Sequence, residues 1–261
     1  MAQIVNNTKN TNSNTNDNTV VIKKETIKRL ASDVKDILNN PLISEGIHYV
    51  HDEDDILLGK ALIIGPSDTP YANGFYFFKF KYPSDYPYSP PRVTYHTNDG
   101  VTRFNPNLYR NGKVCLSILN TWKGPQWTSC QTIRSVLMCL CGSVLNDEPL
   151  LNEPGITKKH LDYNNYLDSI RYKNYETAIL GMLNSDYIQQ QFTEFYSIIV
   201  NHFLENYQLI VNQLNKDTID DAIISISIYK MTTSIKYTLL QKKLETAYEQ
   251  LQQYKDLFNK L

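Results

Sequence analysis

The sequence predicts an α+β fold, in which an antiparallel sheet is followed by helices. Apolar residues recur at the three-and-four spacing of an amphipathic helix between residues 27 and 38. Three apolar or aromatic runs bounded by Gly, Pro or Asp come next, at 57–64, 75–82 and 92–95. Beyond Gly155 only helical spacing remains. We therefore expect a helix, then a sheet, then more helices.

Length and charge restrict the organisation of the chain and its partners. With 261 residues it can form one large domain, or one domain of ordinary size with an appendage. Its 26 basic and 27 acidic residues give a net charge of -1, so no global field draws it to nucleic acid or to an acidic membrane surface. The 41% hydrophobic content is typical of globular proteins. We expect a folded protein that binds neither nucleic acid nor membranes.

The first residues form a tract dominated by Asn and Thr. Such a tract has too few apolar groups to offset the entropy of ordering it, so over residues 1–24 a flexible arm is favoured over a folded element. The tract has no apolar stretch that a signal peptide or a membrane span could use. We expect a reducing compartment, namely the cytoplasm, with the nucleus as an additional location.

The residues that end helices and form turns predict the next elements. A helix is expected from Glu25 to Leu38, because Asn39-Asn40-Pro41 stops it. The three apolar runs, with a weaker one at 47–50, predict an antiparallel meander. Around Cys115 the chain is expected to be irregular, because an Asn-Pro and an Asn-Gly pair precede it. A second helix is expected from about Gln131 to Leu145.

Residues 156–261 are expected to form an all-helical extension. Within it, Thr218 is expected to cap the start of a helix that contains Ala222. The last helix, from Tyr237 to Phe258, repeats apolar residues by three and four through three heptads. These heptads either pack on neighbouring helices or form a coiled-coil seam for a further contact.

The four cysteines differ in their local setting. Cys139 and Cys141 fall in a predicted helix, whereas Cys115 follows a turn in an irregular stretch, and loops carry function more often than core elements. With Cys130, they contain no Cys-x-x-Cys pair, so neither a zinc site nor any other metal site is expected. By residue type alone, each thiol is more often an inert buried side chain than a nucleophile.

Five ordered motifs surround Cys115. They are IKRL at 27–30, GPSDTPY at 65–71, YPSDYPYSPP at 82–91, RFNPNLY at 103–109, and NGKVCLSIL at 111–119 with Trp122 and Trp127 after it. In this order and at these separations they resemble the ubiquitin-conjugating enzymes. The resemblance implies an α+β conjugating core over residues 25–155, with an N-terminal helix, a four-stranded antiparallel meander, an active-site loop and a following helix.

Two further segments resemble the Z-type members of that family. The loop at 121–127 is longer than usual, and Asn152-Glu153-Pro154-Gly155 precedes a helical extension. The resemblance implies that Cys115 accepts ubiquitin, or a ubiquitin-like modifier, from an activating enzyme as a thioester. The modifier then passes to a lysine of a protein substrate, usually with a ubiquitin ligase.

The residue types suit this chemistry. A thioester stays electrophilic towards an amine, whereas an oxyester gives aminolysis too little driving force. Exchange between two thioesters of similar energy needs no histidine base, because a thiol is intrinsically nucleophilic. This fits the chain, since its five histidines form no motif with Cys115. ATP belongs to the activating enzyme, so no cofactor is expected here.

The resemblance also assigns residues that assist the transfer. Asn107 matches the family residue that stabilises the oxyanion formed when the lysine attacks, although its side chain could instead only brace the loop. Glu148 and Asp147, which precede Pro149, are candidate acids that activate the incoming lysine. Their alternative role is solvation of a helix terminus.

Other positions are implied to contact partners. Lys28 and Arg29 match the basic pair that contacts the activating enzyme, and the implied ligase surface contains Tyr88, Trp127, Ser129 and Cys130. The chain departs from the family pattern in three places. Asn105 replaces His, Tyr88 replaces Phe, and Thr128-Ser129-Cys130 replaces Ser-Pro-Ala.

Two rival functions come from other classes. A catalytically silent module could keep this fold to bind ubiquitin or a ligase, but the presence of Cys115 together with Asn107 argues against it. A cysteine hydrolase is disfavoured by the absence of a motif-linked histidine.

Overall fold

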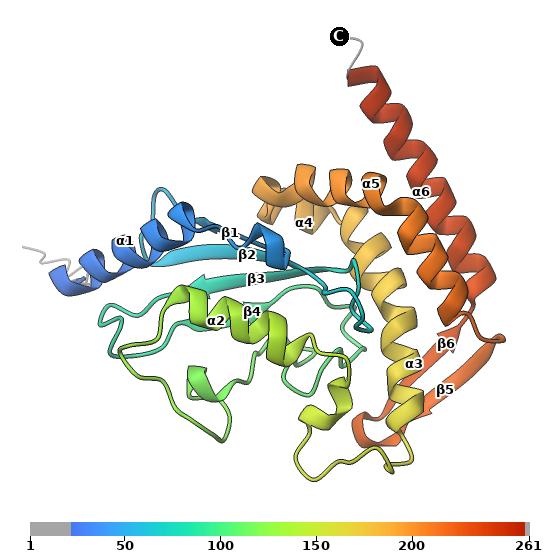
Figure 1. Cartoon of the computed structure of the whole chain (residues 1–261), viewed down its shortest axis with the longest axis horizontal. Helices are drawn as coiled ribbons and strands as arrows, with labels where there is room; N and C mark the ends of the chain where they lie inside the picture. Colours follow the sequence, from blue (N-terminus) through green and yellow to red (C-terminus); the bar gives the residue numbers. More distant parts are fainter. Residues whose placement is uncertain (1–21, 259–261) are drawn as a thin grey trace, which may run out of the picture.

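A computed structural model describes residues 22–258 as an α+β molecule (Figure 1). The elements occur in the order α1 (Lys24–Asn39), η1 (Ile43–Glu45), β1 (Ile47–His51), β2 (Leu58–Ile64), β3 (Phe75–Lys81), β4 (Arg92–Tyr95), η2 (Ser117–Leu119), α2 (Ile133–Cys139), η3 (Leu140–Val144), η4 (Pro149–Asn152), α3 (Tyr163–Lys173), η5 (Asn174–Gly181), α4 (Asp186–Gln191), α5 (Thr193–Asp217), β5 (Ala222–Ile226), η6 (Ser227–Tyr229), β6 (Met231–Ile235) and α6 (Tyr237–Phe258). The arm expected over residues 1–24 lies outside the described residues up to residue 21, and α1 already begins at Lys24. None of the helices described is long and apolar enough to cross a membrane.

The four-strand meander is confirmed. Strands β1 to β4 form one antiparallel sheet in sequence order, with Leu62 opposite Phe77 and Phe78 opposite Tyr95. All residues of β3 except Lys79 and Lys81 are aromatic, and these aromatic side chains are buried on both faces of the strand.

The two faces of β3 pack against different parts of the chain. Phe77 contacts Phe192 and Phe195, with ring centroids 4.9 Å and 6.4 Å apart, so α4 and α5 of the extension cover this face. Tyr76 points the other way and contacts Phe104, which precedes the irregular stretch. Consequently, one continuous hydrophobic core contains residues from both sides of Gly155.

The expectation of an all-helical extension is wrong. Ala222–Ile226 and Met231–Ile235 form a two-stranded antiparallel hairpin. Their side chains alternate between buried and exposed, as Ile224 and Ile226 are buried while Ile223 is 76% exposed. Thr218 does not begin a helix. Its hydroxyl donates to Leu214 O at the end of α5, over a distance of 2.8 Å.

Helix α6 is confirmed over its predicted range, and most of its apolar stripe packs inside the molecule. Tyr237, Leu240, Leu244 and Ala247 are buried, and Leu251 is half-buried. Tyr207 of α5 stacks on Tyr248 of α6 with ring centroids 4.0 Å apart. The first of the two alternatives for the heptads is thus confirmed as far as Leu251. The side chains of the last two heptad residues, Tyr254 and Phe258, are outside the described set.

Candidate functional site

The backbone around Cys115 is held from two sides. Cys115 N donates to Asn107 O at 2.9 Å. On the other side, the Thr121 hydroxyl accepts from Leu116 N at 2.9 Å and lies 3.1 Å from Val114 O, which can accept its proton. The Cys115 side chain is only 1% exposed. Neighbouring groups must therefore move before the thiol can meet a thioester on another protein.

The Asn107 side chain braces the residue that carries this thiol. Its Nδ2 donates to Cys115 O at 2.6 Å, and its Oδ1 accepts from Asn152 Nδ2 at 3.0 Å. In this conformation the Asn107 side chain thus braces the loop, as one of the two alternatives expected. The oxyanion role stays a prediction, and the second Nδ2 proton is available for it, because the amide NH2 group carries two donors.

Asn105, which stands where the family has His, organises the loop from inside. It is fully buried, and its Nδ2 donates to Val144 O at 2.7 Å and to Tyr71 Oη at 3.1 Å. Its Oδ1 accepts from Asn107 N at 2.8 Å. Asn105 therefore ties the active-site loop to η3 and to the turn before β3.

We expect Asn105→Ala to destabilise the fold. Truncation leaves Val144 O and Asn107 N–H buried without these partners, which costs about 3 kcal/mol of unfolding free energy. Urea denaturation followed by circular dichroism measures this loss. Asn39→Ala at the exposed end of α1 is the control, with an expected change below about 0.5 kcal/mol. Equal stability of the two variants would contradict the role given to Asn105.

The extended loop folds back onto the residues that follow Cys115. Gly124 has a φ of 131°, and a Cβ there would lie 3.0 Å from Ser117 Cβ, so only glycine suits this close approach. Trp127 N donates to Asn120 Oδ1 at 2.8 Å, which closes the loop. A cavity of about 530 Å³ lies between this loop and Pro154.

Glu148 and Asp147 differ in their surroundings. Glu148 Oε1 accepts from Tyr163 Oη at 2.5 Å and also pairs with the Lys158 ammonium. These two contacts, that of Lys158 first, hold the pKa of the Glu148 carboxyl below its ordinary value. Asp147 is exposed. At neutral pH, Glu148 is consequently an ionised, well-oriented carboxylate and a weaker base than an ordinary Glu.

Removing the Lys158 charge should change the titration of Glu148. We expect Lys158→Met to raise the Glu148 pKa towards its ordinary value, because the largest cause of its lowering is lost. A lowered folded-state pKa adds stability at neutral pH, and this stability is lost as the pH falls through that pKa. NMR titration of the Glu148 side-chain carbon measures the shift, with exposed Lys159→Met as the matched control. An unchanged Glu148 pKa in Lys158→Met would refute this account.

The two predicted partner surfaces meet in the structure. Arg29 donates from Nη1 to Ser129 O at 2.7 Å, from Nη2 to Gln131 O at 2.5 Å, and from Nε to Asp33 Oδ1 at 2.8 Å. Lys28 is exposed. The Arg29 guanidinium thus binds its own chain, and of this pair only Lys28 is exposed.

The predicted ligase residues do not all reach the surface. Tyr88 is 66% exposed, and Ser129 and Cys130 are exposed as well. Trp127 is 8% exposed and its Nε1 donates to Pro87 O at 2.7 Å. The Trp127 indole therefore anchors the loop that carries Tyr88, and the place of Trp127 in the ligase surface stays a prediction.

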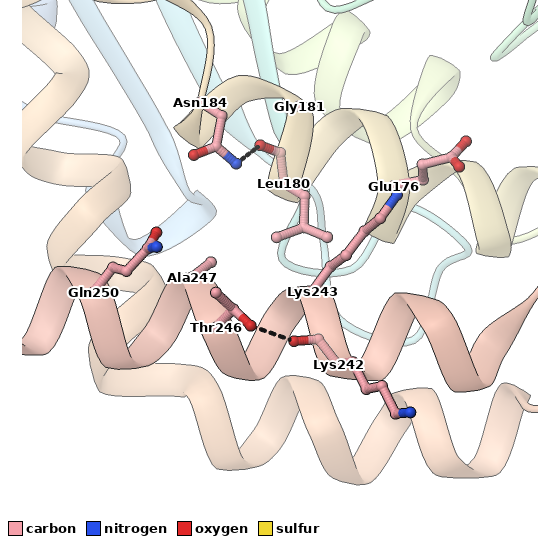
Figure 2. A pocket seen from close by; sticks show the side chains of 9 residues that line it. All are labelled: Glu176, Leu180, Gly181, Asn184, Lys242, Lys243, Thr246, Ala247 and Gln250. Atoms are coloured by element: carbon pink, nitrogen blue, oxygen red, sulfur yellow. Dashed lines mark hydrogen bonds between the residues drawn. The ribbon is translucent and has the colours of Figure 1, made fainter.

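Other polar groups and cavities lie apart from Cys115. In the described part of the chain, no histidine hydrogen-bonds to Cys115 and no acid, His or Cys cluster could hold a metal ion. Burial lowers the pKa of His96 to about 4. A cavity of about 430 Å³ lies between η5 and α6. Figure 2 shows its lining residues, with Lys243 extending towards Glu176. None of the residues that line this cavity belongs to the predicted site.

The sequence of the site matches a known family. The ubiquitin-conjugating enzyme family matches residues 29–166, which is more than half of the 261 residues. The chain belongs to the ubiquitin-conjugating enzyme family. The match includes Cys115, Asn107 and both candidate acids.

Individual relatives agree with this membership. The chain is 41% identical to ubiquitin-conjugating enzyme E2 Z of Danio rerio over 187 residues, which cover 70% of this chain and 56% of the relative. It is 44% identical to E2 Z of Homo sapiens over 158 residues, 59% of this chain and 44% of the relative. The dual E2 ubiquitin-conjugating enzyme/E3 ubiquitin-protein ligase BIRC6 of Homo sapiens is 45% identical over 135 residues, 49% of this chain and 3% of the relative. The chain spans about half the length of the E2 Z relatives.

Sequence reasoning missed several residues that shape the site. Asn152 and Thr121 were seen only as parts of motifs, although their side chains hold Asn107 and the Cys115 backbone. Tyr163, which binds Glu148, was not singled out at all. A hydroxyl six residues after the cysteine is a local signal that could have identified Thr121. The other two contacts depend on how distant segments pack.

Proposed function

We propose that this protein is an active ubiquitin-conjugating enzyme whose nucleophile is Cys115. Membership of the family implies ubiquitin, an activating enzyme and a ligase as general partners. One observation carries the proposal. Within the segment that the family match covers, the Asn107 side chain donates to Cys115 O and the Thr121 hydroxyl accepts from Leu116 N, so the backbone around Cys115 is held from both sides.

In the first step, the Cys115 thiolate attacks the thioester carbonyl carbon of the modifier on its activating enzyme. A new C–S bond forms to Cys115, the old C–S bond breaks, and the activating enzyme leaves as a thiolate. The two thioesters have similar energies, so the exchange needs little assistance beyond proximity.

In the second step, a substrate lysine attacks the Cys115 thioester. A C–N bond forms, the C–S bond breaks, and the electron pair returns to the Cys115 sulfur. The amine loses its proton to solvent, and an ionised Glu148 favours this by orienting the amine and stabilising its developing positive charge. The oxyanion that forms on the carbonyl is the group to which the Asn107 amide donates.

Several finer assignments belong to this proposal. Lys28 contacts the activating enzyme, while Tyr88, Ser129 and Cys130 face the ligase, and the exposure of all four residues supports these assignments. Asp147 is a second acid available to the incoming lysine. Charging with different modifiers and their activating enzymes identifies the modifier that the enzyme carries.

The test is a charging assay with activating enzyme, ATP and ubiquitin, run on gels with and without reductant. We expect an adduct that reductant removes. The 1% exposure of Cys115 is the one observation that favours the rival, a silent module that only binds ubiquitin or a ligase. If no adduct forms with ubiquitin or with any ubiquitin-like modifier and its own activating enzyme, the proposed conjugating activity is wrong.

A further inference from the structure

The turn of the C-terminal hairpin lies against the segment that leads into the active-site loop. Arg110 Nη2 donates to Tyr229 O at 2.8 Å, and Arg103 N donates to Met231 Sδ at 3.3 Å. The Tyr229 hydroxyl donates to Glu153 Oε2 at 2.8 Å. More than a hundred residues separate Arg103 from Tyr229 and Met231 in the sequence, so tertiary folding alone joins them.

The hairpin turn is itself fixed in place. Buried Asp162 accepts from Ser227 Oγ at 2.6 Å and from Ile228 N at 3.0 Å through one carboxylate oxygen. The hydroxyls of Ser169 and Thr233 form a hydrogen bond between α3 and β6, and Figure 1 shows the hairpin alongside α3. These bonds fix the turn in place, so it can support the Arg103 and Arg110 side chains that pack on it.

Arg103 connects this support to the peptides immediately before Asn107. Its guanidinium stacks on Tyr109, 3.3 Å from the ring centroid, and lies 5.3 Å from the Tyr229 centroid. Its Nε donates to Asn105 O at 3.0 Å and its Nη2 donates to Pro106 O at 2.6 Å. A planar guanidinium held between rings can grip two successive carbonyls, whereas a lysine ammonium cannot reproduce this fork.

No carboxylate determines where Arg103 sits. Among residues 22–258, neither Arg103 nor Arg110 forms an ion pair, and both are half-buried. The position of the Arg103 guanidinium thus depends on the rings of Tyr109 and Tyr229 and on the two carbonyls. Of these, only Tyr229 comes from the C-terminal extension.

We propose that the hairpin turn is a positioning element for acyl transfer. Tyr229 holds the Arg103 guanidinium, and Arg103 in turn holds the carbonyls of residues 105 and 106, so that the Asn107 amide is placed to donate to the oxyanion. This inference rests on the proposed function, and it gives the C-terminal extension a role in the second step. Transfer to lysine depends on Asn107 geometry, whereas loading of Cys115 does not.

The test separates loading from transfer. Purified full-length Tyr229→Ala and Arg103→Lys are charged with ubiquitin, and single-turnover discharge to free lysine is then followed as a function of lysine concentration. We expect the maximal discharge rate to fall on the order of tenfold in each variant, with the half-saturating lysine concentration unchanged. Loading rates should stay within about twofold of wild type, because thioester exchange needs mainly proximity.

A double-mutant cycle shows whether the effect passes through Asn107. In an Asn107→Ala background, Tyr229→Ala should cause no further loss, because the positioned donor is already absent. Ile223→Thr, on the exposed face of the same hairpin, is the control and should discharge at the wild-type rate. Thermal unfolding of every variant checks the fold, and Arg103→Lys provides the measurement if Tyr229→Ala does not fold.

Two results would overturn the inference. One is wild-type discharge by both Tyr229→Ala and Arg103→Lys, and the other is an equal loss on adding Tyr229→Ala to wild type and to Asn107→Ala. Failure of the wild-type protein to load is a different outcome, and it counts against the proposed function itself.

Discussion

Cys115→Ala is expected to form no covalent adduct with ubiquitin, and Cys115→Ser is expected to form one that survives reductant. Alanine has no nucleophile, while serine attacks the same carbonyl but gives an oxyester, which thiols do not cleave under gel conditions. The oxyester also gives aminolysis too little driving force, so Cys115→Ser should accumulate its adduct and release none to lysine. Gel analysis with and without reductant measures both effects.

The other thiols provide the control for this experiment. Cys139 is half-buried in α2, and burial raises the pKa of its thiol, so it is a poor nucleophile at neutral pH. Cys139→Ser should therefore load like wild type. A reductant-sensitive adduct on the Cys115→Ala protein would show that a different cysteine carries the modifier.

Asn107→Ala is expected to slow discharge to lysine by on the order of 10²–10³-fold, because it removes the amide donor offered to the oxyanion. Loading should change far less. The same substitution leaves Cys115 O without its side-chain partner, and we expect a loss of about 1–3 kcal/mol in unfolding free energy. Single-turnover discharge of the loaded enzyme and urea denaturation measure the two effects separately.

Asn152→Ala distinguishes the two roles of Asn107. It removes the bond to Asn107 Oδ1 and leaves the Asn107 Nδ2 donor in place. If Asn107 only braces the loop, both variants should lose stability, and each loaded enzyme should still discharge at nearly the wild-type rate. A wild-type discharge rate in Asn107→Ala would thus remove the oxyanion role.

The sequence pattern was sufficient to predict the strands of the four-stranded sheet but not those of the hairpin. The run from Phe75 to Tyr82 has a strong aromatic content and clear turn residues at both ends, so it predicted β3 within one residue. The hairpin strands contain β-branched residues, but each is only five residues long, and the hairpin lies between the long helices α5 and α6. The helical period of the surrounding segments masked their period of two. So short a strand becomes stable only when it pairs with another strand and a further element, here α3, covers one of its faces.

The sequence by itself determined the α+β class, the family, the four-strand sheet and the identity of the candidate nucleophile, because these depend on local periodicity and on motifs contiguous with Cys115. It also predicted that the 261 residues divide into a core and an appendage. Tertiary structure alone decided how the appendage is used: α4 and α5 close one face of β3, and Tyr229 supports Arg103 beneath the active-site loop. It also buried Trp127 and turned Arg29 inward. These outcomes depend on hydrogen bonds and ring contacts between residues 40 to 126 positions apart, which no local pattern contains.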